Sequence, residues 1–168
     1  VAKVVGTDPR TDIALLKVEP QEPMPAVTFG DSDLSRVGDW VLAIGNPLGQ
    51  GFSVSAGIIS ARNRELSGPY DDYIQTDAAI NRGNSGGPLF NMDGEVIGVN
   101  TAILSTNGGS IGLGFSMASN VVERVVNQLQ EFGETRRGWL GVGIQNVTPD
   151  MAEAMALSSA KGAAVTEV

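Results

Sequence analysis

The sequence predicts an all-β fold, a barrel or a sandwich of short strands, followed by one helix. Short apolar runs recur along residues 1–118, and residues typical of turns separate each run from the next. The chain has 22 glycines and only 5% aromatic residues, which suits many tight turns between aliphatic strands. After residue 118 the apolar spacing changes to that of a helix.

The strands are expected in a regular order. The first two runs flank the turn "TDPRTD", and the glycine-rich "GNPLGQG" separates the next two. A later pair flanks Asp93-Gly94, a residue pair that is favoured in tight hairpins. The expected strand regions are residues 1–6, 13–18, 37–47, 52–63, 71–80, two runs within 88–104, and 111–119.

Residues 120–132 are expected to form an amphipathic helix. Asn120 and Glu123 resemble a capping box, and apolar residues recur at helical spacing up to Gly133. These apolar residues are Val121, Val122, Val125, Val126, Leu129 and Phe132.

The polar stretch 133–138 is typical of a linker. Residues 139–157 predict a strand and a short helix, and residues 162–168 begin another strand. These residues are too few to bury a core alone, and the first residues read as a strand already under way. We therefore expect a chain that is cut at both ends.

Composition excludes several classes of function. The net charge of −8 argues against binding nucleic acid through a cationic surface. The chain has no cysteine, which removes disulfides and thiolate catalysis, and no histidine. No loop has calcium-binding spacing, so neither a metal nor a cofactor is expected. No segment reaches the roughly 18 apolar residues of a membrane helix.

The stretch "NRGNSGGPLF", residues 81–90, places Ser85 among glycines. It fits G-x-S-x-G, but the nucleophile elbow needs a helix directly after the serine, and Pro88 with a hairpin follows here. A serine nucleophile needs a neighbouring base. Only the chain order His, Asp, Ser places the histidine upstream, outside these residues. In that order Asp12 is the candidate aspartate. Taken alone, the motif also fits a serine in a glycine-rich turn.

Five segments together resemble the HtrA (Deg) family of serine endopeptidases: "TDIALLKV", "GDWVLAIGNPLG", "GIISA", "IQTDAAINRGNSGGPLFNMDGEVIGVNTAI" and "GFSMASN". The resemblance covers nearly the whole chain, and the run around Ser85 is highly specific. It implies a chymotrypsin-like double β-barrel followed by a PDZ domain. The implied parts are the end of the first barrel (1–30), the complete second barrel (31–118), a closing helix and linker (119–137), and the start of a truncated PDZ domain (138–168).

The resemblance also implies roles for single residues. Ser85 would be the nucleophile, and Asp12 would orient and stabilise the missing imidazole. The N–H groups of Gly83 and Ser85 would form the oxyanion hole. Substrate would be bound by Ile80, Asn81, Arg82, Asn84, Thr101, Ile103 and Leu104. Ile80 and Ile103 would lie at the mouth of a small apolar pocket that selects Val, Ala or similar side chains.

Other positions receive structural or regulatory roles. Asn84 stands where digestive trypsin-like enzymes carry an aspartate, so activation by zymogen cleavage is not expected. Asp77 is expected to make a structural hydrogen bond within its own loop. Residues 61–73 would form a loop that senses activators, held by Arg62 or Arg64. The PDZ loop that binds C-terminal carboxylates would consist of Trp139, Leu140, Gly141 and Val142.

The resemblance implies an ATP-independent serine endopeptidase of protein quality control, with no metal or cofactor. It would cleave unfolded or damaged proteins after small aliphatic residues, as a homotrimer or a multiple of trimers, in the periplasm or another extracytoplasmic compartment. The 168 residues alone are expected to be inactive. The alternative is a catalytically inactive chaperone or PDZ-type peptide-binding module on the same fold, which the absence of histidine supports. A structural β-domain with a PDZ adaptor would leave "GNSGG" unexplained.

Overall fold

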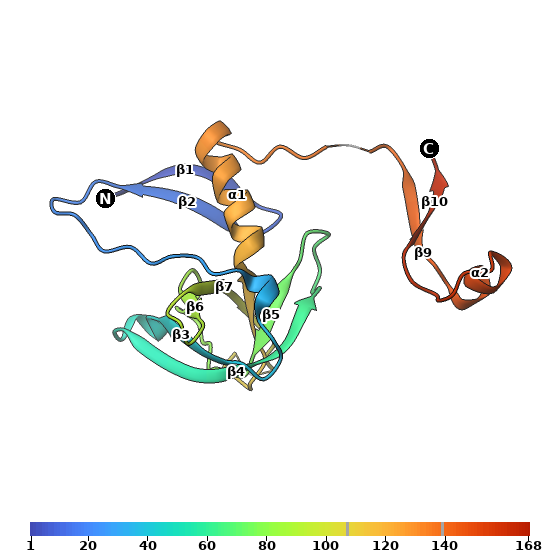
Figure 1. The fold of residues 1–168 in the computed structure, drawn as a ribbon. Coiled ribbons are helices and arrows are strands. Elements are labelled where there is room, and N and C mark those ends of the chain that lie inside the picture. The colour runs from blue at the N-terminus through green and yellow to red at the C-terminus, as the bar shows by residue number, and fades with distance from the viewer. Residues whose placement is uncertain (107, 139) are drawn as a thin grey trace. The chain divides into compact units, whose positions relative to one another are not determined.

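The computed structural model describes residues 1–106, 108–138 and 140–168, which form two compact units, residues 1–135 and 136–168 (Figure 1). The first unit contains β1 (Ala2–Asp8), β2 (Ile13–Val18), η1 (Ser32–Leu34), β3 (Trp40–Gly45), η2 (Pro47–Gly49), β4 (Ser53–Arg64), β5 (Tyr73–Thr76), β6 (Pro88–Phe90), β7 (Val96–Ile103), β8 (Gly114–Ala118) and α1 (Ser119–Phe132). The second contains β9 (Gly143–Asn146), α2 (Pro149–Ala154) and β10 (Ala163–Glu167). Each predicted strand and helix is present. None of the helices in these ranges has the length and apolar character needed to cross a membrane.

Strands β3 to β8 close into an antiparallel barrel in the order β3–β4–β5–β8–β7–β6. Side chains alternate between the two faces of a strand, so in β3 Val41 and Ala43 are buried inside the barrel, whereas Trp40 is exposed. The other buried apolar side chains of these strands include Ile59, Ile74, Leu89, Ile97, Phe115 and Met117. The all-β prediction is confirmed, and the closed barrel decides between barrel and sandwich.

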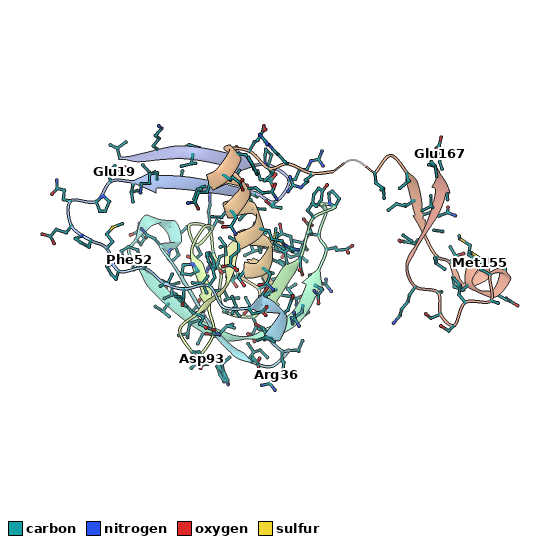
Figure 2. All side chains as sticks on the ribbon, turned by 45° about the horizontal axis from the view of Figure 1, so that its top comes forward. Glu19, Arg36, Phe52, Asp93, Met155 and Glu167 are labelled. Carbon is teal, nitrogen blue, oxygen red and sulfur yellow. The ribbon has the colours of Figure 1, made fainter. Side chains whose placement is uncertain are left out.

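Helix α1 covers the barrel and the β1–β2 hairpin (Figures 1 and 2). Its apolar face, predicted from the helical spacing, buries Val121, Val122, Val125 and Leu129. On the hairpin side, Gly6 of β1 approaches so closely that a Cβ there would collide with the carbonyl of Gly133. The helix ends at Gly133 as predicted, in the left-handed conformation with φ 75°.

The predicted capping box of α1 is wrong. The helix begins at Ser119, and its N-cap is Ala118, which has no side chain to cap with. Asn120 instead donates from Nδ2 to Asp31 Oδ1 at 2.7 Å. The buried Ser119 hydroxyl donates to the Gly30 carbonyl at 2.6 Å. Contacts with the segment before η1, distant in sequence, therefore determine where the helix starts.

The loop predicted at residues 61–73 is shorter than expected. Strand β4 continues to Arg64, so only residues 65–72 connect it to β5. Arg62 forms an ion pair with Asp33 of η1 at 3.5 Å, which ties the end of β4 to the segment before the barrel. Asp71 Oδ2 accepts the N–H groups of residues 66, 67 and 68. Hydrogen bonds to the Asp71 carboxylate thus order the connection between β4 and β5.

The second unit is a two-stranded antiparallel sheet with one short helix. Thr148 caps α2, because its hydroxyl accepts the Met151 N–H at 3.3 Å. The predicted succession of strand, helix and strand is confirmed, while its assignment to a PDZ domain stays a prediction. Trp139 lies outside the described residues, Leu140 is exposed and Gly141 has φ 67°.

Candidate active site

Ser85 lies on an exposed turn between β5 and β6. Its Oγ donates to the carbonyl of Thr101 on β7 at 3.3 Å. Gly83 and Gly86 on either side have φ 103° and 83°, which L side chains rarely adopt. The turn is joined to β7 at its far end, where Gly86 N–H donates to the Asn100 carbonyl and Asn100 N–H donates to the Gly87 carbonyl, both at 2.8 Å. The backbone conformation of this turn therefore requires the glycines that flank Ser85 in the sequence.

The turn around residues 46–49 determines which way the peptide groups near Ser85 face. Leu48 N–H donates to the Arg82 carbonyl at 2.9 Å, and Asn46 N–H donates to the Gly83 carbonyl at 3.4 Å. Because a trans peptide is planar, its C=O and N–H point in opposite directions. The Gly83 N–H therefore faces away from Leu48.

Two amide groups of this turn are unused in the described part of the chain. Neither the Gly83 N–H nor the Ser85 N–H donates to another described residue. A Cβ at Gly83 would collide with the Asn46 carbonyl, and one at Gly87 with the Ile44 carbonyl. The turn is thus packed from behind, while two free donors flank an exposed hydroxyl.

Asn84 is buried beside Ser85, with 3% of its surface exposed. It packs against Gly45 so tightly that a Cβ added to Gly45 would lie 2.7 Å from the Asn84 side chain. Its Oδ1 has no hydrogen-bond partner among the described residues. The neighbouring Asn81 accepts the Ser110 N–H at 2.9 Å, and Arg82 is exposed.

Two of the apolar residues predicted to bind substrate, Ile80 and Ile103, lie next to Gly114 of β8. The buried Ile80 packs over this glycine, where a Cβ would lie 2.9 Å from Ile80 Cδ1. Ile103 of β7 is the cross-strand partner of Gly114. Leu104 is exposed and donates its N–H to the Leu113 carbonyl at 2.9 Å, while Thr101 Oγ1 donates to the Val99 carbonyl at 2.9 Å. Ile80 and Ile103 thus both lie next to Gly114, and their place in one apolar pocket stays a prediction.

Asp12 lies on the turn between β1 and β2, beside the connection from β4 to β5, and no hydrogen bond to Ser85 is found among the described residues. The turn lines a cavity of about 350 Å³ together with Ser67, Gly68, Pro69, Asp71 and Tyr73 of β5. Burial raises the pKa of Tyr73, and the carboxylates of Asp71 and Asp12 raise it further. Asp12 therefore lines the same cavity as Asp71 and Tyr73.

Asp77, the other carboxylate near Ser85 in sequence, has the structural role that was predicted but a different partner. Its Oδ1 accepts the Ile58 N–H of β4 at 2.7 Å, so the bond leaves its own loop. In the described ranges, no three aspartate, glutamate, histidine or cysteine side chains gather as a metal site.

Sequence reasoning missed two features of the site. The turn at residues 46–49 was interpreted only as a break between strands, although its Asn-Pro pair and its glycine are typical of an ordered turn. Asp8 was read as part of a polar turn, yet its carboxylate is buried. An aspartate directly before a proline is a signal for a side-chain-capped turn, but nothing in the sequence reports its burial.

A closed antiparallel barrel that presents an exposed, glycine-flanked serine beside free backbone amides defines the class of chymotrypsin-like serine proteases. Residues 1–99 match the family model described as "Trypsin-like peptidase domain". The chain belongs to this family.

Relatives and solved structures agree with this assignment. Proteins named "Probable periplasmic serine endoprotease DegP-like" match at 57% identity in Rhizobium meliloti (strain 1021) and at 54% in Bartonella henselae (strain ATCC 49882 / DSM 28221 / CCUG 30454 / Houston 1). Each match covers 99% of this chain and 33% of the relative, so the chain spans about a third of their length. The solved "HtrA-type protease AlgW with tripeptide" is 48% identical with a TM-score of 0.91, covering 99% of this chain and 56% of that one. The predicted resemblance to HtrA proteases and the chymotrypsin-like fold are confirmed.

Proposed function

We propose that this chain is the part of a serine endopeptidase that carries the nucleophile Ser85 and the aspartate Asp12. The observation that carries the proposal is the turn at residues 83–87, which leaves the Ser85 hydroxyl exposed and two N–H groups free. The names of the relatives, serine endoproteases and HtrA-type proteases, support it.

In the proposed reaction, Ser85 Oγ attacks the carbonyl carbon of the substrate peptide bond and its proton passes to an imidazole. That imidazole comes from a segment outside these 168 residues, which contain no histidine, and Asp12 orients it. The N–H groups of Gly83 and Ser85 donate to the oxyanion that forms. Collapse expels the amine, which takes the proton from the imidazolium, and water then hydrolyses the ester on Oγ.

Covalent labelling of the full-length protein tests this function. A fluorophosphonate probe is expected to attach to Ser85, because only an activated serine displaces fluoride from phosphorus quickly. Peptide mass spectrometry reads the modified residue, and the heat-unfolded protein is the control. An unlabelled Ser85 in the folded protein would favour the alternative, an inactive chaperone or peptide-binding module.

The proposed substrates are unfolded or damaged proteins, cleaved after small aliphatic residues. Ile80 and Ile103, which both lie next to Gly114, support a pocket that is narrow and apolar. Asn81, Arg82, Asn84, Thr101 and Leu104 are proposed to bind the substrate around this pocket. The periplasm is the proposed compartment, since the relatives carry that word in their names.

Ile80→Ala in the full-length protein is expected to shift cleavage partly toward larger residues. One methylene in an apolar pocket changes selectivity by about 1–3 kcal/mol, so the shift is incomplete. Removing a buried isoleucine side chain also costs about 2–5 kcal/mol of stability. Ile97→Ala is the matched control, because Ile97 is equally buried but lies elsewhere in the barrel. Mass spectrometry of casein fragments reads the profile, and identical profiles for both variants would remove Ile80 from the pocket.

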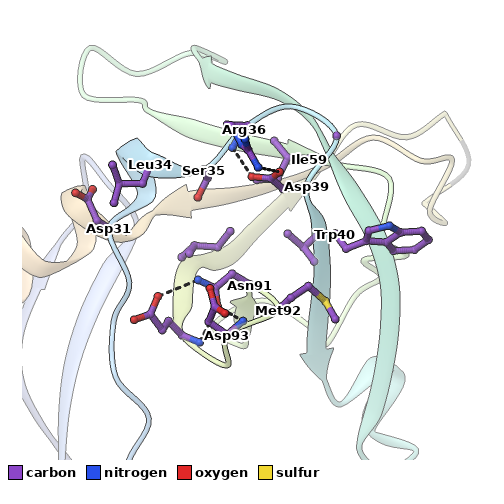
Figure 3. A pocket seen from close by; sticks show the side chains of 14 residues that line it. Asp31, Leu34, Ser35, Arg36, Asp39, Trp40, Ile59, Asn91, Met92 and Asp93 are labelled. Atoms are coloured by element: carbon purple, nitrogen blue, oxygen red, sulfur yellow. Dashed lines mark hydrogen bonds and ion pairs between the residues drawn. The ribbon is translucent and has the colours of Figure 1, made fainter.

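We further propose that the full-length protein assembles as a homotrimer or a multiple of trimers. One face of the barrel supports self-association, because Trp40 and Met92 are 62% and 68% exposed and line one cavity of about 620 Å³ (Figure 3). Large apolar side chains exposed together mark interaction surfaces. At its edge Arg36 and Asp39 form an ion pair at 3.3 Å.

The second unit is proposed to begin a PDZ domain that binds C-terminal peptides. Leu140, Gly141 and Val142 directly precede β9, in the position expected of a carboxylate-binding loop before a strand. Trp139, the remaining residue of the predicted loop, lies outside the described residues.

A further inference from the structure

The turn that carries Asp12 has an unusual conformation at that residue. Thr11 N–H donates to the Asp8 carbonyl at 3.3 Å, which closes a turn with Pro9 at its second position, and aspartate and proline are favoured at these two places. Asp12 follows with φ 57°, in the left-handed region that favours glycine. An aspartate therefore occupies a position where glycine would be less strained.

Asp8 has a buried carboxylate that none of the proposed catalytic steps uses. It is 2% exposed and accepts hydrogen bonds at both oxygens. Oδ2 accepts from Thr11 Oγ1 at 2.7 Å, and Oδ1 accepts from Arg10 N–H at 3.4 Å. Oδ1 also accepts from Thr135 Oγ1 at 3.1 Å, which joins the turn to the segment directly after α1. The Asp8 carboxylate thus forms hydrogen bonds within the turn and also joins the turn to the segment that follows α1.

We infer that Asp8 is a positioning residue for the proposed catalytic aspartate. A residue held in a sparsely populated conformation persists only where its surroundings over-determine it. Asp8 supplies that restraint from inside the turn, and the Arg10 guanidinium, 5.7 Å from the centroid of the Tyr70 ring, adds a contact on the outside. Without Asp8 the turn relaxes, and the Asp12 carboxylate moves away from the imidazole it orients. The inference rests on the proposed role of Asp12.

The electrostatic surroundings of Asp12 determine what this displacement does. The charged and titratable groups that line the cavity with Asp12 are Arg10 on the same turn, Asp71 on the connection to β5, and Tyr73 on β5, and the carboxylate of Asp8 is buried within the turn. A neighbouring carboxylate raises the pKa of an imidazole, so a displaced Asp12 lowers that pKa. The acid limb of kcat/KM then moves to lower pH, a change that a general loss of stability does not produce.

The test uses Asp8 variants of the full-length protein, assayed on a chromogenic peptide well below the unfolding temperature. Asp8→Ala is expected to lower kcat about 10- to 100-fold with little change in KM, since small misplacements of a catalytic group have effects of this size. The acid limb of the pH profile of kcat/KM is expected to move to lower pH. Asp8→Asn restores part of the rate, because its amide oxygen still accepts hydrogen bonds.

A second pair of variants and a control keep the test decisive if Asp8→Ala does not fold. Thr135→Val removes one hydrogen-bond donor to Asp8 and is expected to lower kcat and shift the acid limb by smaller amounts. Thr135→Ser keeps the hydroxyl and is expected to restore the wild-type kcat and acid limb. Ser119→Ala, which removes another buried hydroxyl bond in the same unit, lowers stability but leaves the pH profile unchanged. Active Thr135→Val with an unchanged kcat and acid limb overturns the inference. A wild-type protein whose Ser85 resists labelling overturns the proposed function instead.

Discussion

Ser85→Ala in the full-length protein is expected to lower kcat for casein cleavage by about 10⁶-fold. The variant keeps the free backbone N–H groups at positions 83 and 85 and the apolar residues at Gly114, so substrate still binds. It loses the hydroxyl that is proposed to form the acyl ester. The residual rate, about 10³–10⁴-fold over water, is expected to come from the proposed oxyanion hole and from substrate binding alone.

The control for this experiment is Ser60→Ala, which removes the hydroxyl of a half-buried serine on β4, in the same barrel. Release of acid-soluble peptides from casein measures both variants, and circular dichroism confirms that both are folded. Ser60→Ala is expected to match wild type. If Ser85→Ala kept more than a few per cent of the activity, the nucleophile would have to be another residue.

Asn84→Asp is expected to destabilise the protein by several kcal/mol at pH 7 and to abolish activity there. The side chain is buried and its Oδ1 has no partner among the described residues, so a carboxylate at this place is ionised without compensation. Burial raises the pKa of such a carboxylate, and each pK unit of difference between folded and unfolded states is about 1.4 kcal/mol.

The sign of the pH effect follows from proton binding. Between the unfolded and the folded pKa of this aspartate, the folded state binds more protons than the unfolded state, so stability falls as pH rises. Urea unfolding at pH 4 and pH 7 should therefore show a small difference from wild type at pH 4 and a large one at pH 7. Asn84→Ala is the matched control, since it removes the unpaired oxygen and adds no charge. Equal losses of Asn84→Asp at both pH values would show that the site accommodates the charge.

The strands were predictable because their signals are local. Alternating apolar residues and turn residues such as Asp93-Gly94 depend on neighbours in sequence, and so does the helix end at Gly133. The start of α1 was not predictable, because Ser119 bonds to Gly30 and Asn120 to Asp31, far away in sequence. The extent of β4 likewise depends on pairing with β5, which the sequence does not display.

The candidate site also has features that local sequence signals predict and features that depend on long-range contacts. Ser85 was identified because its glycines are contiguous with it, and the specificity of the motif came from a family resemblance. The Leu48 N–H that orients the Arg82 carbonyl and the burial of Asp8 follow from chain segments that meet only after folding. Asp12 was assigned by chain order, whereas its left-handed conformation is a property of the folded turn.

The closure of the barrel decides where other chains can add to the described strands by backbone pairing. Every strand from β3 to β8 has two neighbours in the closed order, so none of these strands is an edge strand of an open sheet. The β1–β2 and β9–β10 sheets have only two strands each, and each keeps two open sides. We therefore expect a strand contributed by another segment or by a bound peptide to pair with one of these small sheets more readily than with the closed barrel. Unwanted pairing between molecules, the first step of β-aggregation, is expected to start there too.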